Sequence, residues 1–301
     1  MKCSCGRNAV IFRRYEGRPL CATCFSQQLE KKVKGDIRRA KLLEKNDIIA
    51  VGLSGGKDSS LTTHFLSEIA EKRKDLEVFA IGIDEGIKGY RDESLKFARK
   101  LCKKRGINFY VFSFKEEYGK TLDQILSEKK GMECTYCGVL RRELLNRKAR
   151  ELGATKLTVG HNMDDELQSL FMNYLKGDFM RLVRLGIKPV LLKNQRFIPR
   201  IKPLRNVPEK EVALYCILNG IEFHNGECPY AGDGIRFDVR DFLNEMEERY
   251  PGIKYTALRA FDSILPILRK HFSGSKLREC KKCGEPTSRD ICKRCELLTT
   301  L

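Results

Sequence analysis

The spacing of the cysteines constrains this chain more than any other feature. Of the thirteen cysteines in 301 residues, four lie near each end, while Cys134 and Cys137 form a separate Cys-x2-Cys pair in the middle. Four cysteines at short spacings can hold a small segment together around one metal ion. The pattern therefore predicts small metal-bound ends around a larger central domain, and it directs the search for chemistry to the middle pair.

Each terminal group has the spacing of a zinc site. Cys280-x2-Cys283 and Cys292-x2-Cys295 form two knuckles, while Cys3-Ser-Cys5 and Cys21-x2-Cys24 make a tighter set. Disulfides are the alternative. No apolar signal segment precedes the cysteines and no run long enough to span a membrane follows them, so we expect a reducing, cytoplasmic location without membrane contact. Two Zn2+ ions are therefore predicted.

The chain is strongly basic, with 58 Lys and Arg against 40 Asp and Glu, a net charge of +18. The basic residues gather in short clusters, each of which is by itself typical of a solvated helix face. Their sum favours a polyanionic partner. We expect RNA rather than a membrane surface, because no basic amphipathic segment carries a large apolar face. The clusters are Lys31-Lys32-Val33-Lys34, Arg38-Arg39, Arg141-Arg142 and Arg147-Lys148.

The central part alternates strand-like and helix-like segments. Four apolar segments have the composition of buried strands: 47–53, 78–83, 108–113 and 156–160. Helical patterns lie between them, among them 92–105 and 138–152. This alternation predicts an α/β fold with a doubly wound parallel sheet. Ligands of such sheets bind beyond the carboxyl ends of the strands, so the residues after Leu53, Ile83 and Gly160 should face one pocket.

Four regions follow from these patterns. We expect an N-terminal zinc-binding module at 1–30, a catalytic domain at 31–230, a helical extension at 231–275 and a zinc ribbon at 276–301. Two further cysteines, Cys102 and Cys216, are interpreted as small buried apolar residues. The run Phe171, Met172, Tyr174 and Leu175 is interpreted as the core face of a helix.

The segment Ser54-Gly-Gly-Lys-Asp-Ser59 directly follows a predicted buried strand. Gly55 and Gly56 permit a tight turn whose backbone N–H groups point at an anion, and a helix beginning near Asp58 adds its positive end. Lys57 would bring a mobile positive charge to the phosphates. The segment is not a Walker loop, which requires Gly in place of Val51 and Ser or Thr in place of Asp58. It predicts a different type of nucleotide site.

This loop resembles the PP-loop of ATP pyrophosphatases, which transfer AMP from ATP to a carbonyl oxygen and release pyrophosphate. Three other segments are similar to the tRNA 2-thiolation branch of that family: Cys134-Thr-Tyr-Cys137-Gly-Val-Leu-Arg-Arg142, Gly160-His-Asn-Met-Asp-Asp-Glu166 and Cys228-Pro229. The resemblance covers nearly the whole chain. It implies an adenine nucleotide alpha hydrolase-like fold and an enzyme that adenylates the C2 oxygen of a uridine and then replaces that oxygen with sulfur.

The target uridine is a finer question. The segment Ile83-Asp-Glu-Gly-Ile-Lys-Gly-Tyr-Arg-Asp-Glu-Ser-Leu95 resembles the archaeal and eukaryotic enzymes that thiolate the wobble uridine more than those that thiolate the T-loop 5-methyluridine. A PP-loop enzyme that amidates a small molecule and a zinc-ribbon RNA-binding protein without catalysis are the rival functions. The sulfur donor stays open between inorganic sulfide, a desulfurase persulfide and the thiocarboxylate of a ubiquitin-like carrier. The resemblance also implies a homodimer.

The resemblance assigns ATP to the loop after the first strand, and we add Asp84, Gly160, Asp164 and Asp165 from the ends of two other strands. Mg2+ would bind Asp58 or the pair Asp164 and Asp165, for which a helix N-cap is the alternative. Arg141 and Arg142 would contact the tRNA backbone or the adenylate, with a solvated helix face as the alternative. The loop residues are Ser54, Gly55, Gly56, Lys57, Asp58 and Ser59.

The catalytic residues that we predict are Cys134, Cys137 and Cys228, together with Lys57 and Asp58. In the enzymes that the chain resembles, three such cysteines hold a [4Fe-4S] cluster with one iron free of protein ligands, which implies the same cofactor here. A third zinc ion, a persulfide relay and a disulfide formed during turnover are the alternatives.

Overall fold

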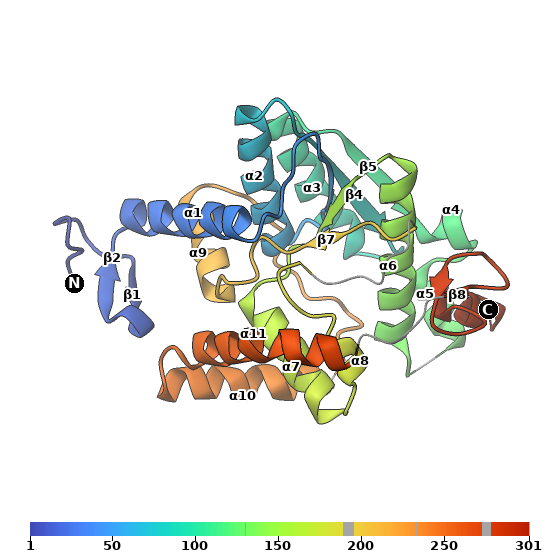
Figure 1. Cartoon of the computed structure of the whole chain (residues 1–301). Coiled ribbons are helices and arrows are strands. Elements are labelled where there is room, and N and C mark those ends of the chain that lie inside the picture. Colours follow the sequence, from blue (N-terminus) through green and yellow to red (C-terminus); the bar gives the residue numbers. More distant parts are fainter. Residues whose placement is uncertain (130, 189–195, 233, 273–277, 301) are drawn as a thin grey trace.

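A computed structural model describes residues 1–129, 131–188, 196–232, 234–272 and 278–300. In this part of the chain a five-stranded parallel sheet lies at the centre, in the order β5-β4-β3-β6-β7 (Figure 1). The predicted α/β fold with a parallel sheet is confirmed. The strands are β3 (Ile48–Gly52), β4 (Glu77–Asp84), β5 (Phe109–Ser113), β6 (Lys156–Thr158) and β7 (Arg200–Ile201).

Helices cover both faces of this sheet, which explains why its inner strands are continuously apolar. Ile49 and Val51 pack on one face with Leu66 of α2 (Lys57–Lys72). Ala50, which points the other way, packs in the same cluster as Leu140 of α6 (Glu133–Glu151). The helix α3 (Arg91–Arg105) covers the same face as α2, through contacts with β4.

The strand order contains a reversal next to β3. The chain runs outward from β3 to β4 and β5, and then returns to place β6 and β7 on the opposite side of β3. The loops after β3 and β6 therefore leave the sheet in different directions and open a crevice between them. Parallel sheets bind their ligands at such a reversal.

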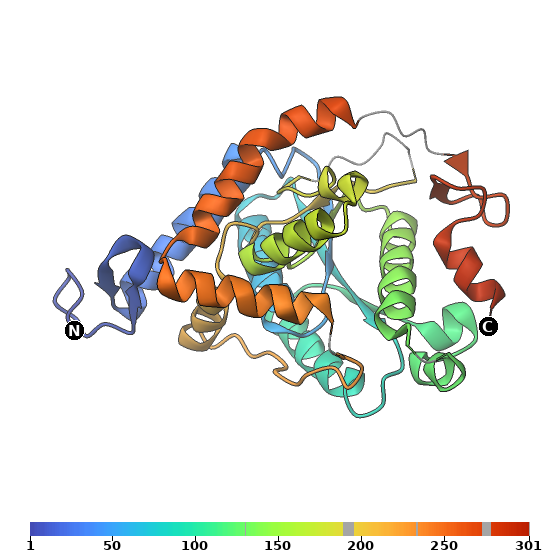
Figure 2. The same cartoon turned by 90° about the horizontal axis from the view of Figure 1, so that it is seen from below.

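The remaining helices extend the sheet domain on two sides (Figure 2). A pair of helices, α10 and α11, packs on α7 through apolar side chains that include Val239, Leu258 and Leu167. The described helices are too short or too polar to cross a lipid bilayer. The elements beyond the sheet and its three covering helices are α1 (Ala22–Arg39), α4 (Phe114–Tyr118), α5 (Leu122–Glu128), α7 (Met163–Leu175), α8 (Phe179–Leu182), α9 (Glu209–Leu218), α10 (Ile235–Arg249), α11 (Ile253–His271), α12 (Lys293–Thr299), the 3-10 helix Arg14–Glu16, and the short strands β1 (Ile11–Arg13), β2 (Arg18–Leu20), β8 (Arg278–Glu279) and β9 (Pro286–Thr287).

The two cysteine-rich ends lie at opposite ends of the molecule, and each docks on a different helix (Figure 1). At the N-terminal end, Arg13 forms a two-point ion pair with Glu211 of α9, at 2.8 and 3.0 Å. At the C-terminal end, Leu297 of α12 packs in the cluster of α6, and Arg150 of α6 pairs with Glu285 at 2.6 Å. The C-terminal module thus rests on the helix that carries Cys134 and Cys137.

Two predictions about single residues have different outcomes. Cys102 and Cys216 are 2% and 0% exposed, which confirms that they are small core residues. The predicted core face of α7 is right for Phe171 and Met172, which pack on α10 and α11. It is wrong for Tyr174 and Leu175, each 63% exposed, because the last turn of α7 extends beyond the elements that cover the rest of it.

Candidate active site

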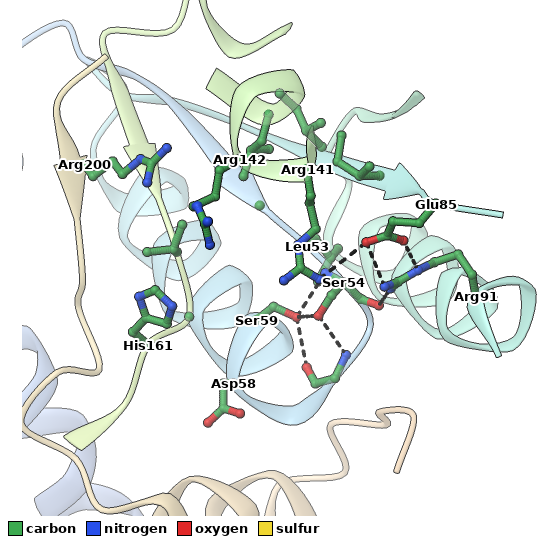
Figure 3. Close-up of a pocket in the computed structure, with 17 residues that line it drawn as sticks. Leu53, Ser54, Asp58, Ser59, Glu85, Arg91, Arg141, Arg142, His161 and Arg200 are labelled. Carbon is green, nitrogen blue, oxygen red and sulfur yellow. Dashed lines mark hydrogen bonds and ion pairs between the residues drawn. The ribbon is translucent and has the colours of Figure 1, made fainter. Parts of the chain in front are cut away.

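A cavity of about 310 Å³ lies at the carboxyl ends of β3, β4 and β6, beside Arg200 of β7 (Figure 3). Its lining includes residues from three loops that follow strands. The loop after β3 contributes Ser54, the loop after β4 contributes Glu85, and the loop after β6 contributes Gly160 and His161. The prediction that these three loops face one pocket is confirmed.

Two glycines are required for the loops to approach so closely. Gly55 has a φ of +87°, and a Cβ atom there would lie 1.9 Å from the carbonyl oxygen of Ser94 in α3. A Cβ atom on Gly160 would lie 2.7 Å from backbone atoms of Asp58 and Ser59. No side chain fits at either position, so both loops can pack against neighbouring backbone only because these residues are glycine.

The loop after β3 presents an anion site to the cavity. Ser54 and Ser59 are joined by a hydrogen bond of 3.1 Å between their hydroxyl groups, and the Ser59 hydroxyl also donates to the carbonyl of Gly56 at 3.0 Å. Gly56 is the N-cap of α2, and no side chain caps this helix end. Its first N–H groups and the helix dipole are therefore available to a bound phosphate.

Lys57, to which we assigned phosphate contact, points away from the cavity. Its ammonium group lies 2.7 Å from Glu209 and 3.1 Å from the carboxylate of Asp58. Burial works against the charge of Lys57, but these two carboxylates outweigh it and raise its pKa. Lys57 would have to exchange Glu209 for a phosphate when ATP binds.

Of the three aspartates predicted for Mg2+, two lie together and one does not. Asn162 donates to Asp58 at 2.8 Å and also forms a capping box with Asp165 at the start of α7. Burial, followed by the charge of Asp58, raises the pKa of Asp165 from 3.8 to about 6. Asp164 instead pairs with Lys254 and accepts the backbone N–H of Glu209 at 2.7 Å. Both oxygens of its carboxylate therefore already have partners within the fold.

A buried acidic residue that the sequence analysis did not select organises one side of the cavity. Glu85 is 0% exposed and pairs with Arg91 at 2.5 Å and with Arg141 at 3.4 Å. Arg91 also donates to the carbonyl of Ser54 at 3.3 Å. The neighbouring Asp84, which the sequence predicts at the ATP site, accepts the backbone N–H of Gly86 at 2.8 Å and does not line the cavity. The sequence places both acids at the right end of β4 but gives no signal for which one faces inward.

The other side of the cavity holds Arg142, His161 and Arg200 (Figure 3). Arg141 and Arg142 are therefore both at the candidate site, as predicted, while Arg200 from β7 was not foreseen. The side chain of His161 is exposed to the cavity, where loss of hydration, followed by the charge of Lys202, lowers its pKa. Its ring is neutral at pH 7, when it can donate or accept a hydrogen bond.

The central cysteines lie beside this cavity. Cys137 and Cys228 pack at the edge of the same cluster as Tyr230, and the exposed Cys134 lies 4.0 Å from the carbonyl oxygen of Tyr230. Burial raises the pKa of Cys137 to about 11, and the nearby Arg141 opposes this shift. Arg141 follows Cys137 by four residues, one turn along the same side of α6. One arginine thus connects the cysteines to the cavity.

The terminal cysteines lie closer to one another than the central cysteines do. In each set of four, all sulfur atoms lie within 4.8 Å of one another, and the central trio does not form such a group among the described residues. Cys5 and Cys21 are 3.5 Å apart and Cys283 and Cys292 are 3.6 Å apart, close to the separation of about 3.8 Å expected around tetrahedral zinc. Both terminal sets can therefore hold a metal ion.

Comparison with known proteins agrees with this geometry. A family model described as the PP-loop domain matches residues 24–245. The chain belongs to the PP-loop family. A second model, the N-terminal LIM domain of the 2-thiouridine synthetase TtuA, matches residues 2–26 and covers the first cysteine set.

Relatives of known function narrow this membership to the tRNA 2-thiolation branch. The tRNA 2-thiolation protein NcsA of Haloferax volcanii is 36% identical over all of this chain and 99% of its own length. The cytoplasmic tRNA 2-thiolation protein 1 of Caenorhabditis elegans is 34% identical over 99% of this chain and 79% of its own. The tRNA-5-methyluridine(54) 2-sulfurtransferase of Pyrococcus horikoshii is 35% identical over 98% of this chain and 93% of its own.

A solved structure is similar over the full length. It is the U34-tRNA thiolase NcsA from Methanococcus maripaludis with its [4Fe-4S] cluster, which is 35% identical, with a TM-score of 0.86 over all of this chain and 96% of that one. The branch predicted from the cysteine and loop motifs is confirmed.

Proposed function

We propose that this PP-loop protein is an ATP-dependent tRNA sulfurtransferase that converts a uridine, with the wobble position favoured, to 2-thiouridine. One observation carries the proposal: the phosphate loop at the uncapped start of α2 and the central cysteines lie beside a single cavity. Arg141 lines this cavity and lies close to Cys137. Activation by ATP and delivery of sulfur can therefore take place at the same uracil.

The first step is the attack of the C2 oxygen on the α-phosphorus of ATP, with loss of pyrophosphate. The loop from Ser54 to Ser59 and the start of α2 would bind the phosphates, and Asp58 and Asp165 would hold Mg2+. Lys57 would leave Glu209 to neutralise the leaving group. Charge neutralisation and positioning supply most of the acceleration in such phosphate chemistry.

In the second step a sulfur nucleophile adds at C2 and AMP leaves. Arg141, held by Glu85 beside Cys137, is placed to balance the negative charge of the adenylate and of the incoming sulfur. Cys134, Cys137 and Cys228 offer the soft, three-thiolate donor set that suits a [4Fe-4S] cluster, and we propose that they hold one. When bound, such a cluster leaves one iron free to hold a sulfur atom.

Other features of the proposal rest on the sequence. The relatives include thiolases of both U34 and the T-loop at nearly equal identity, and the segment from Ile83 to Leu95 makes us favour the wobble uridine. We also propose that the terminal cysteines bind zinc, that the four regions end near residues 30, 230 and 275, and that the enzyme is a cytoplasmic homodimer. The sulfur donor would be inorganic sulfide or a ubiquitin-like carrier thiocarboxylate.

The test is anaerobic incubation of the protein with ATP, Mg2+, sulfide and unmodified tRNA, followed by mass spectrometry of the nucleosides. We expect 2-thiouridine in wild-type tRNA and none in a transcript whose wobble uridine is replaced by cytidine. Pyrophosphate release should depend on tRNA. Thiolated T-loop 5-methyluridine with an untouched wobble base would overturn the position, and pyrophosphate release with ammonia and without tRNA would favour the amidating alternative.

A further inference from the structure

The arginines that line the cavity differ in how their charge is balanced. Arg91 and Arg141 share the buried carboxylate of Glu85. Arg142 and Arg200, on the side of the cavity toward His161, have no ion pair and no hydrogen bond among the described residues (Figure 3). The two guanidinium groups therefore line the same cavity without a counter-charge among the described residues.

Both arginines project from regular elements of the fold, with Arg142 exposed and Arg200 half-buried. Arg142 lies over Gly138 on its own helix, where a Cβ atom would be only 3.1 Å from its Nη1 atom. The missing side chain at Gly138 leaves the room that the guanidinium occupies. Arg200 begins β7, which pairs with β6 through Leu157. The pair thus stands on two rigid elements, α6 and the sheet.

This arrangement is unfavourable without a ligand. Burial, and then the charges of Arg200 and Arg141, lower the pKa of Arg142 to about 10, and burial lowers the pKa of Arg200. His161, which is neutral at pH 7, offers no negative charge in return. Two like charges held together in a partly enclosed space repel one another, and a bound anion offsets that repulsion.

We propose that Arg142 and Arg200 form a second anion site, which binds a phosphate group other than those held by the loop after β3. The site rests on the proposed function, which supplies two sources of such a group: a backbone phosphate next to the target uridine, or the pyrophosphate released from ATP. Paired guanidinium groups bind phosphate oxygens through parallel hydrogen bonds. Arg181 on α8 lies outside the lining but near enough to act on the charge of Arg142; it is 73% exposed and pairs with Asp178 at 3.2 Å, and a basic side chain on the solvent side of Arg142 favours the RNA phosphate.

The test compares Arg142→Gln and Arg200→Gln with Arg99→Gln, which removes one exposed positive charge of α3 outside the cavity. Binding of fluorescent tRNA is measured by anisotropy at several salt concentrations, and binding of pyrophosphate by calorimetry. Circular dichroism and thermal melting report whether each variant is folded. Thiolation is assayed separately, so a protein that binds phosphate here but does not thiolate tRNA would overturn the proposed function and leave this site standing.

If the phosphate belongs to tRNA, each cavity variant should weaken tRNA binding about 10-fold and lower the salt slope by about one, with pyrophosphate binding unchanged. If it belongs to pyrophosphate, the loss should be in pyrophosphate binding alone. Either result supports the site. Affinities for both ligands within about twofold of those of Arg99→Gln would overturn it, because removing a phosphate contact costs more than that.

A measurement on the unaltered protein covers the case in which a variant does not fold. Phenylglyoxal modifies accessible guanidinium groups, and mass spectrometry gives the extent at each arginine. We expect Arg142 and Arg200 to be protected by tRNA, while Arg99 stays equally reactive. If neither tRNA nor pyrophosphate protects Arg142 and Arg200, the proposed site is wrong.

Discussion

The terminal and the central cysteines are arranged in ways that suit opposite purposes. At the ends, four sulfur atoms converge within 4.8 Å, and the first cysteine of the second knuckle also caps a helix, as Cys21 does for α1 and Cys292 for α12. In the centre, Cys134, Cys137 and Cys228 are more widely spread and lie beside a charged cavity. A closed four-ligand set stabilises a fold, whereas three ligands leave a position for a reactant.

The largest expected effect is on activity, and it comes from a change at one of the central cysteines. We expect Cys228→Ala to reduce thiolation by roughly 10³-fold or more, because a ligand of the sulfur site is lost, and to leave the melting temperature almost unchanged. Nucleoside mass spectrometry and thermal melting measure the two. Cys102→Ala, at a core cysteine that does not line the cavity, is the control and should keep its activity. A Cys228→Ala enzyme with normal turnover would remove the distinction.

The converse is expected at the C-terminal set. Cys292→Ala removes both a proposed metal ligand and the cap of α12, and should destabilise the C-terminal module by about 4 kcal/mol. Zinc release, followed with a colorimetric chelator, and thermal melting report this loss. Because the module rests on α6, a moderate fall in activity is expected to follow the fall in stability. Full zinc content and an unchanged melting curve would contradict a metal site.

A change at Glu85 tests whether its buried ion pairs with Arg91 and Arg141 stabilise the central region. Glu85→Gln leaves Arg91, only 4% exposed, without its carboxylate and should cost about 3 kcal/mol in the free energy of unfolding. It also frees Arg141, so kcat for thiolation should fall further than the stability loss explains. Urea denaturation and single-turnover rates distinguish the two effects.

The control for Glu85 is Glu222→Gln, which breaks a surface pair with Lys100. Exposed ion pairs contribute little, so this variant should behave like the wild type in both assays. Equal behaviour of the Glu85 and Glu222 variants would mean that the buried network does not position Arg141.

The smallest expected effect is the loss of folding stability that results from burying the charged carboxylate of Asp165. The folded-state pKa of Asp165 is raised from 3.8 to about 6, so the folded protein holds a proton there that the unfolded chain has released. Stability is therefore lost as pH rises from about 4 to 6. Without ATP and Mg2+, Asp165→Asn should be about 1 kcal/mol more stable at pH 7, a reduced figure because the side chain is one-third exposed, and no different at pH 3.5.

The same variant should bind Mg2+ and ATP more weakly, because the amide carries no charge. Thermal melting across pH and calorimetric titration of ATP with Mg2+ measure these two effects. A destabilised Asp165→Asn protein at pH 7 would show that the capping contact with Asn162 outweighs the burial of the charge.

Local sequence patterns predicted much of the fold. Each predicted strand lies within two residues of its observed bounds, since buried parallel strands are continuous apolar runs between helices. The pocket followed from the positions of the strand ends. The directions of the side chains could not be predicted from the strand ends, and the predictions of site residues were wrong where they depended on those directions. Lys57 turns to Glu209, Asp164 turns to Lys254, and Glu85 rather than Asp84 faces the cavity.

These departures have one physical cause. The partners of Lys57 and Asp164 come from distant segments: Glu209 lies 152 residues from Lys57, and Lys254 lies 90 residues from Asp164. A buried charge takes whichever opposite charge the packing brings near, and no local pattern encodes that choice. Motifs of fixed spacing, by contrast, report chemistry that a single loop or helix turn already determines.

For this protein, the sequence alone determined the sheet with its phosphate loop, the four-cysteine ends and the family, because each depends on residues close together in the chain. Only the tertiary structure decided which charges meet. It placed Glu85 between Arg91 and Arg141, brought Arg142 and Arg200 together without a counter-charge, and set Cys228 beside Cys137, because these contacts join strands and helices whose mutual distances are fixed by packing.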